Sequence, residues 1–189
     1  MPRSIYYLPG HGGRIETGLG EALHSRGFDV VGRETIGEFK KLPFNEQVAL
    51  IAKDLTASYW HEDDRVIANS FGAYLFLHAQ ELMQPYIGRV LLLSPIVGEF
   101  WNDDTMMGFS PPQAGRLLEL ATGGTYPAPK HCEIHVGEND WQSNPRNVIE
   151  LAELLGLAVT VVPDAGHMLG KGYVGAVLDR WLDGSEDVT

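Results

Sequence analysis

The sequence is poor in cysteine, in positive charge and in long hydrophobic runs, and each shortage excludes a class of protein. Its 189 residues include a single cysteine, Cys132, so no disulfide can form within the chain. No uninterrupted apolar run approaches the roughly 20 residues of a membrane-spanning helix. Asp and Glu outnumber Lys and Arg by 25 to 14, and the net charge of -11 disfavours nucleic acid and anionic membranes as partners.

The N-terminus also lacks the features of a secretion signal. Met1-Pro2-Arg3 leads directly into the strand-like segment Ser4–Leu8, with no apolar signal core and no small-residue cleavage site. We therefore expect a cytoplasmic protein. With 44% hydrophobic and 21% charged residues, the chain has the composition and length of a single globular domain, residues 1–189.

Short β-rich runs alternate with segments of helical periodicity along the chain. The runs are Ile5–Leu8, Phe28–Val31, Arg65–Ala68, Val90–Leu93, Glu133–Val136 and Ala158–Val162. This alternation is typical of parallel strands joined by helical crossovers, and right-handed crossovers place helices on both faces of the sheet. The sequence therefore predicts an α/β fold, a three-layer α/β/α sandwich around a mainly parallel six-stranded sheet.

The interval 95–129 breaks this rhythm, because it has no clear strand and one predicted helix, Gln113–Thr122. We interpret it as a lid or pocket wall, since a long insertion beside a functional loop is well placed to form an apolar substrate pocket. The alternative is that its large apolar side chains only pack over the helices below. The candidate pocket residues are Trp101, Met106, Met107 and Phe109.

The segment Arg65–Leu75 carries the most informative pattern, an apolar strand that runs through Ala68-Asn69-Ser70-Phe71-Gly72 into an apolar helix. Small residues at both ends of the pattern permit a sharp strand-to-helix turn that exposes the serine. The N–H of Phe71 then lies at a helix N-terminus, which favours a developing oxyanion. We interpret Ser70 as a nucleophile and Phe71 as one oxyanion donor.

A serine hydroxyl needs a neighbouring base, and the base needs a carboxylate to orient it. His167 follows the last predicted strand, and Asp140 follows the strand before it. Glu138 is a competing acid that the sequence alone does not dismiss, whereas Asp164 is close to His167 and typical of a turn. Because these groups and Ser70 all follow strands, we expect them to converge at one edge of the sheet.

The loop Leu8–Gly13 follows the first predicted strand and is rich in glycine. Glycines let backbone amides approach a reacting carbonyl, so we predict the second oxyanion donor here, Gly13 first and Gly12 next. A phosphate-binding loop is the alternative, but neither a P-loop ending nor GxGxxG spacing is present. We interpret His11 as shaping the loop. The histidines show no metal-ligand pairing such as HExxH, so no metal is predicted.

Over nearly its whole length the chain resembles the α/β-hydrolase superfamily. Ser70, Asp140 and His167 match the nucleophile, acid and base of that superfamily, and Leu8–Gly13 matches its oxyanion loop. The chain is most similar to short members that begin at the strand before the oxyanion loop, such as small bacterial serine esterases and thioesterases.

Two residues near Ser70 depart from the family pattern. Ala68 replaces the first glycine of GxSxG, and Asn69 stands where histidine, glutamine or glutamate is more usual. The resemblance implies a serine hydrolase that cleaves a small-molecule ester or thioester through an acyl-enzyme, without a cofactor. The alternative is a catalytically silent protein of the same fold that binds a small ligand or a protein partner. The sequence leaves the oligomeric state open.

Overall fold

The computed structural model describes residues 4–183, so residues 1–3 and 184–189 of the predicted domain lie outside the description. The strands are β1 (Ser4–Leu8), β2 (Asp29–Gly32), β3 (Arg65–Asn69), β4 (Arg89–Leu93), β5 (Phe100–Asn102), β6 (Met107–Phe109), β7 (His131–Gly137) and β8 (Ala158–Val162). The helices are α1 (Leu19–His24), α2 (Gly37–Lys41), α3 (Phe44–Ser58), α4 (Phe71–Glu81), α5 (Arg116–Thr122), α6 (Pro145–Leu155) and α7 (Lys171–Asp183).

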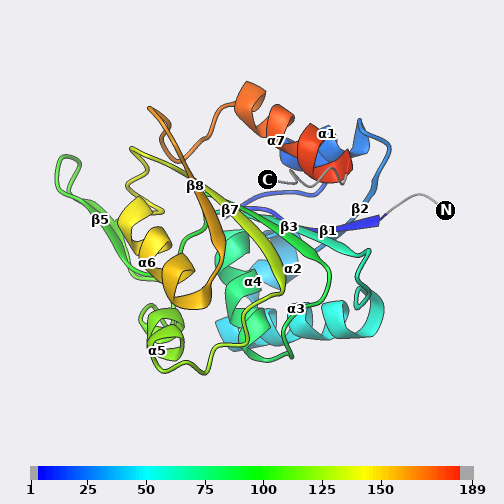
Figure 1. Ribbon diagram of the computed structural model, residues 1–189, viewed down its shortest axis with the longest axis horizontal. Helices are drawn as coiled ribbons and strands as arrows, with labels where there is room; N and C mark the ends of the chain where they lie inside the picture. Colours follow the sequence, from blue (N-terminus) through cyan, green and yellow to red (C-terminus); the bar gives the residue numbers. More distant parts are fainter. Residues whose placement is uncertain (1–3, 184–189) are drawn as a thin grey trace.

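The main sheet has the strand order β2-β1-β3-β4-β7-β8, and each neighbouring pair is parallel (Figure 1). Its strands are those predicted from the sequence, so the predicted α/β fold with a parallel six-stranded sheet is confirmed. β2 lies on one side of β1, and β3 lies on the other side. The later strands β4, β7 and β8 follow beyond β3 in that order. In sheets of this kind, ligands bind beside such a change of direction in the strand order, beyond the carboxyl ends of the strands, here β1 and β3.

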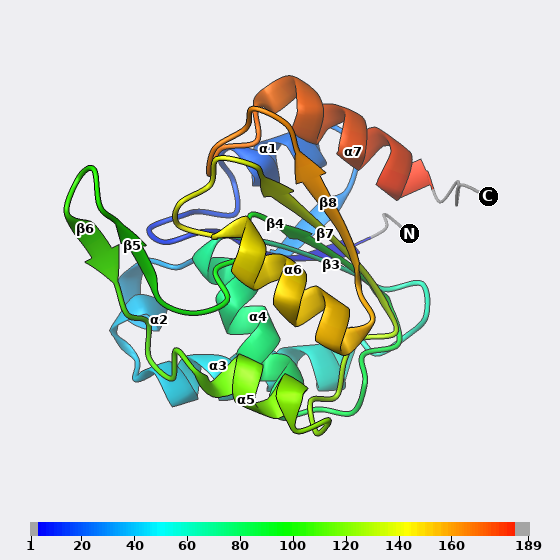
Figure 2. The ribbon, with the colours of Figure 1, turned by 60° about the vertical axis from the view of Figure 1, so that its left-hand side comes forward.

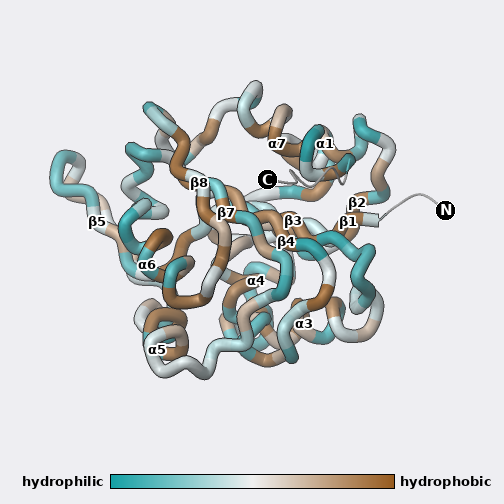
Figure 3. Tube along the Cα trace, in the orientation of Figure 1, coloured by the Kyte–Doolittle hydropathy of each residue, from teal (hydrophilic) through white to brown (hydrophobic). Residues whose placement is uncertain are grey.

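The side chains of β1 alternate between two hydrophobic cores, one on each face of the sheet. Tyr6 and Leu8 lie in the core formed with α3, α4, α5 and α6, whereas Ile5 and Tyr7 lie in the core formed with α1 and α7. Figure 1 shows α1 and α7 on one side of the sheet and α3 to α6 on the other, which gives the predicted three layers. In Figure 3 much of the hydrophobic colour lies along the central strands between these layers.

The segment 95–129 differs from the prediction, because it contains a β-hairpin. β5 and β6 pair antiparallel and form a separate two-stranded sheet, which projects from the body of the molecule (Figure 2). Each strand has only three residues, too few for the alternation that reveals a strand in a sequence. The predicted helix is present but begins at Arg116, since Gln113 has a φ of 60° and is outside the helical region.

Within residues 4–183, no helix has the length and apolar character needed to cross a membrane.

Candidate active site

Ser70 lies at the turn between β3 and α4 and has a φ of 52° and a ψ of -121°. A positive φ is uncommon for a residue other than glycine and persists where the surroundings fix it. The Ser70 N–H donates to the Leu93 carbonyl over 3.0 Å, and the Ser70 carbonyl accepts from the Ile96 N–H over 3.3 Å. The main chain of β4 and its following loop therefore hold the serine in this conformation.

Two glycines allow the loop after β1 to pack directly on this turn. A Cβ atom at Gly72 would lie 2.2 Å from the Leu8 carbonyl oxygen and 2.4 Å from that of Pro9. A Cβ atom at Gly10 would lie 3.2 Å from the Ser70 Cβ atom. The contact with β1 thus requires a small residue at Gly72, two positions after Ser70, as predicted. The glycine of the loop that contacts Ser70 is Gly10.

His167 reaches Ser70 from the loop that follows β8. Its Nε2 atom lies 2.8 Å from the Ser70 Oγ atom, which is hydrogen-bonding distance. The histidine is separated from the serine by 97 positions along the chain. Parallel strands bring the two together because their carboxyl ends meet at the same edge of the sheet.

Asp140 lies on the other side of the His167 ring. The His167 Nδ1 atom is 2.9 Å from Oδ2 and 3.0 Å from Oδ1 of this carboxylate. Oδ1 also accepts from the backbone N–H groups of Gln142 and Ser143, over 2.9 and 2.8 Å. Asp140 is only 2% exposed, so these donors replace the water that a buried carboxylate would otherwise require.

The competing acid, Glu138, does not contact His167 in this way. Glu138 is exposed, and its Oε2 atom accepts from the Asp164 N–H over 3.0 Å. Asp164 itself has a φ of 57° and turns the chain between β8 and His167. The acid in contact with the histidine is therefore Asp140, and Glu138 supports the loop that carries the histidine.

The N–H of Phe71 is the first amide of α4 and makes no hydrogen bond to another described residue. The amide predicted as its partner, that of Gly13, is already engaged. The Gly13 N–H donates to the Gly10 carbonyl and to the Thr35 Oγ1 atom, each over 2.9 Å. The predicted leading oxyanion donor, the Gly13 N–H, therefore points to acceptors within the protein rather than toward Ser70.

His11 follows Gly10, the residue that packs against Ser70, and among the described residues its N–H has no acceptor. The imidazole of His11 meets the Phe71 ring edge-on, with 5.8 Å between the ring centroids. These contacts place His11, rather than Gly13, beside the turn. Gly12 is exposed and has a φ of 73°, a conformation that glycine adopts without strain.

The sequence profile of a family described as serine hydrolase matches residues 45–184. The chain belongs to the serine hydrolase family. No curated protein matches its sequence.

Solved structures of low sequence identity share the fold of this serine hydrolase. Carboxylesterase CesB from Bacillus subtilis has 16% identity and a TM-score of 0.67, over 98% of this chain and 85% of that chain. The ydeN gene product from B. subtilis has 14% identity and a TM-score of 0.65, over 96% and 99%. Alpha/beta hydrolase domain-containing protein 10 from mouse has 13% identity and a TM-score of 0.64, over 95% and 89%. The α/β-hydrolase fold predicted from the motifs is thus confirmed.

In this serine hydrolase, the side chain of Asn69, the unusual residue before Ser70, is hydrogen-bonded to the neighbouring strand β1. The Tyr7 hydroxyl donates to the Asn69 Oδ1 atom over 2.9 Å and so joins β1 to β3 near the turn. Burial raises the pKa of the Tyr7 hydroxyl, which therefore stays protonated and able to donate. The Asn69 side chain therefore links two neighbouring strands beside Ser70.

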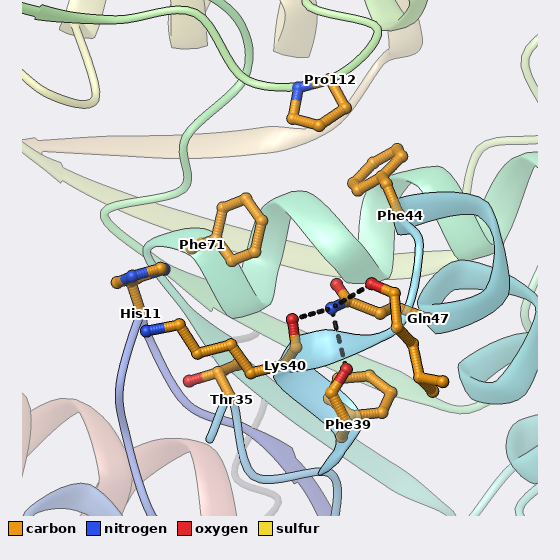
Figure 4. A pocket seen from close by; sticks show the side chains of 9 residues that line it. His11, Thr35, Phe39, Lys40, Phe44, Gln47, Phe71 and Pro112 are labelled. Carbon is orange, nitrogen blue, oxygen red and sulfur yellow. Dashed lines mark hydrogen bonds between the residues drawn. The ribbon is translucent and has the colours of Figure 1, made fainter. Parts of the chain in front are cut away.

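A cavity of about 200 Å³ opens beside Phe71 (Figure 4). It is lined by His11, Thr35, Phe39, Lys40, Leu42, Phe44, Gln47, Phe71 and Pro112. His11 and Phe71 connect the cavity to the turn that carries Ser70. Pro112 comes from the segment 95–129 and is tied to α4, because the Tyr74 hydroxyl donates to the Pro112 carbonyl over 2.7 Å.

The side chains predicted to form a substrate pocket lie on or between β5 and β6 and do not line this cavity. Trp101, Met106 and Met107 are 57%, 72% and 58% exposed, so they do not pack over the helices. Phe109 is 43% exposed and approaches the cavity through Phe71, with 6.5 Å between the ring centroids. The hairpin therefore presents apolar side chains to solvent next to the cavity.

Sequence reasoning missed Ser143, which is fully buried beside Asp140 and His167. Its Oγ atom donates to the Ser94 carbonyl over 2.6 Å and lies 3.5 Å from the His167 Nδ1 atom. A serine three residues after the predicted acid was the only signal, and it is weak. Within residues 4–183, no cluster of three His, Cys, Asp or Glu side chains is arranged to hold a metal ion.

Proposed function

We propose that this serine hydrolase cleaves an ester or thioester of a small molecule through Ser70, His167 and Asp140. The observation that carries the proposal is the continuous chain of contacts from Ser70 Oγ to His167 Nε2 and from His167 Nδ1 to Asp140. Such a chain joins a nucleophile, a base and an orienting acid, which is what acyl transfer at neutral pH requires.

In the first step, the Ser70 Oγ atom attacks the carbonyl carbon while its proton passes to His167 Nε2. The amide of Phe71 and, in place of Gly13, the amide of His11 are the proposed donors to the oxyanion, with Gly12 as the alternative. The protonated imidazole then gives its proton to the leaving alcohol or thiol as the bond to the acyl carbon breaks. Asp140 stabilises the imidazolium.

In the second step, a water molecule gives a proton to His167 Nε2 and attacks the acyl carbon of the acyl-enzyme. The bond from the acyl carbon to the Ser70 oxygen breaks, and Ser70 recovers its proton from the imidazolium as the acid leaves. Each proton is held by a group already in position, and the proposed cycle uses no cofactor. Cytoplasmic location and the absence of nucleic-acid or membrane partners stay predictions from the sequence.

We further propose that the single domain uses the segment 95–129 as the outer wall of its substrate pocket. Pro112 of this segment lines the cavity, and the Phe109 ring makes an edge-on contact with the ring of Phe71, another lining residue. On this proposal Trp101, Met106 and Met107 contact longer or bulkier substrates that extend beyond the cavity.

The test is hydrolysis of p-nitrophenyl esters from acetate to long acyl chains by the wild type, Ser70→Ala and Ser58→Ala. Ser58 is an exposed serine at the end of α3 and serves as the matched control. We expect Ser70→Ala to lower kcat/KM at least about a thousandfold and Ser58→Ala to have no effect. Undiminished hydrolysis by a folded Ser70→Ala protein would refute the proposal.

Labelling with a fluorophosphonate probe separates the proposed enzyme from the catalytically silent alternative. The probe reacts with an activated serine, so we expect it to label the wild type and Ser58→Ala but not Ser70→Ala. Failure to label the folded wild type would favour a protein that binds a ligand without turnover.

A further inference from the structure

The cavity beside Phe71 has apolar walls and a small number of polar side chains. The polar ones are His11, Thr35, Lys40 and Gln47, and no Asp or Glu is among the lining residues. The apolar ones are Phe39, Leu42, Phe44, Phe71 and Pro112. A mostly apolar cavity with few polar groups is typical of a small-molecule site, and those polar groups decide what binds.

Two of the polar side chains are already used within the protein. The Thr35 hydroxyl donates to the Gly10 carbonyl and accepts from the Gly13 N–H. The Gln47 amide donates from Nε2 to the carbonyl of Lys40 over 3.3 Å, and also to those of Phe39 and Leu42. Gln47 is 7% exposed, so a buried side chain fixes the backbone of α2 at Lys40.

The Lys40 ammonium, in contrast, has no acidic partner among residues 4–183. The next residue, Lys41, pairs with Glu38 over 2.6 Å and does not line the cavity. In Figure 4 the Lys40 side chain extends along the cavity with its nitrogen toward His11, the residue that contacts Phe71. A cation without a counter-ion thus lies on the cavity wall in a chain whose net charge is -11.

We infer that the cavity binds a short apolar arm of the substrate that ends in an anionic group, paired with Lys40. The inference rests on the proposed function, because the arm belongs to the ester or thioester cleaved at Ser70. A volume of about 200 Å³ is below the roughly 300 to 1,000 Å³ of pockets for drug-sized ligands, which limits the arm to a few carbon atoms and a carboxylate. The aromatic walls contact the carbon atoms, and the ammonium contacts the carboxylate.

The arm can belong to the acyl group or to the alcohol, and two pairs of substrates distinguish these sources. On the acyl side, the p-nitrophenyl monoester of adipate is compared with p-nitrophenyl heptanoate, in which an ethyl group replaces the carboxylate. On the alcohol side, the butyrate ester of γ-hydroxybutyrate is compared with pentyl butyrate in a pH-stat assay. For each pair, kcat/KM is measured in the wild type, Lys40→Met and Lys41→Met, whose folding is checked by circular dichroism.

We expect one of the two pairs to show an anionic-to-neutral ratio of kcat/KM that falls about twofold to fivefold in Lys40→Met, because Lys40 is exposed. The ratio should stay at the wild-type value in Lys41→Met, which removes the same charge one residue away. Added salt should lower the wild-type ratio and leave that of Lys40→Met unchanged, because salt screens an exposed pair. A ratio that Lys40→Met leaves unchanged in both pairs would overturn the inference.

A binding measurement separates the failure of this inference from the failure of the proposed function. Ser70→Ala protein is titrated with pentanoate and with pentanamide, which differ in charge but hardly in shape, by NMR or calorimetry. We expect pentanoate to bind more tightly, and Ser70→Ala/Lys40→Met to lose that difference. Equal binding of the two ligands to Ser70→Ala would refute the anionic site. If pentanoate bound more tightly but no ester showed Ser70-dependent hydrolysis, the proposed function would be refuted while the anionic site would stand.

Discussion

Replacing Asp140 by Asn tests the proposed roles of Asp140 and Glu138 by changing one atom of the acid. The Asp140 Oδ1 atom accepts from the amides of Gln142 and Ser143, so the oxygen of an asparagine is held at that position. Its NH₂ group then takes the place of Oδ2, which lies 2.9 Å from the His167 Nδ1 atom, slightly nearer than Oδ1 at 3.0 Å. A donor there makes Nδ1 an acceptor, and the proton moves to Nε2.

A proton on Nε2 leaves His167 unable to take the proton of Ser70, which lies 2.8 Å from that atom. In a serine protease the same change of acid lowers kcat by about 10⁴. We expect kcat/KM of Asp140→Asn to fall by about 10³ to 10⁴, which corresponds to roughly 4 to 5.5 kcal/mol of transition-state stabilisation. The assay is p-nitrophenyl butyrate hydrolysis at pH 7.5, with urea unfolding to confirm the fold.

Glu138→Gln is the matched control, because it makes the same chemical change in an exposed acid that bonds the Asp164 N–H. A glutamine oxygen can accept this bond, so we expect kcat/KM within about twofold of the wild type. The reasoning would be refuted if Asp140→Asn stayed within tenfold of the wild type. It would also be refuted if Glu138→Gln lost as much activity as Asp140→Asn.

Two further predictions concern stability and are tested by urea unfolding. Gly72→Ala places a Cβ atom 2.2 Å from the Leu8 carbonyl oxygen, so we expect a loss of about 3 kcal/mol; an unchanged unfolding midpoint would contradict this contact. Burial lowers the pKa of His78 from 6.5 to about 4, so unfolding takes up a proton below pH 6.5. The free energy of unfolding should therefore fall by about 3 kcal/mol as the pH decreases from 6.5 to 4. His78→Phe, which keeps an aromatic ring between Phe44 and Tyr74, should weaken this dependence, and an equally steep decrease in the variant would exclude His78 as its origin.

The sheet could be predicted from the sequence because each of its strands leaves a local signal. A strand buried between two helical layers must be apolar, and each crossover must contain a helix of the right length. The hairpin β5–β6 left no such signal, since its strands are three residues long and their side chains are exposed or only half-buried. The predicted start of the helix Gln113–Thr122 was also wrong, since the helix begins at Arg116. The positive φ of Gln113 depends on its surroundings, which the sequence does not show.

The sequence by itself determined the order of the functional elements: a serine after one strand, an acid and a histidine after two later strands, and a glycine loop after the first. Parallel strands meet at a common edge, so this order was enough to bring the residues to one place. Only the tertiary structure decided between groups a few residues apart. Asp140 faces His167 while Glu138 bonds Asp164, and the Gly13 amide is occupied by Thr35. Such choices depend on hydrogen-bond directions across segments distant in sequence, which no local pattern records.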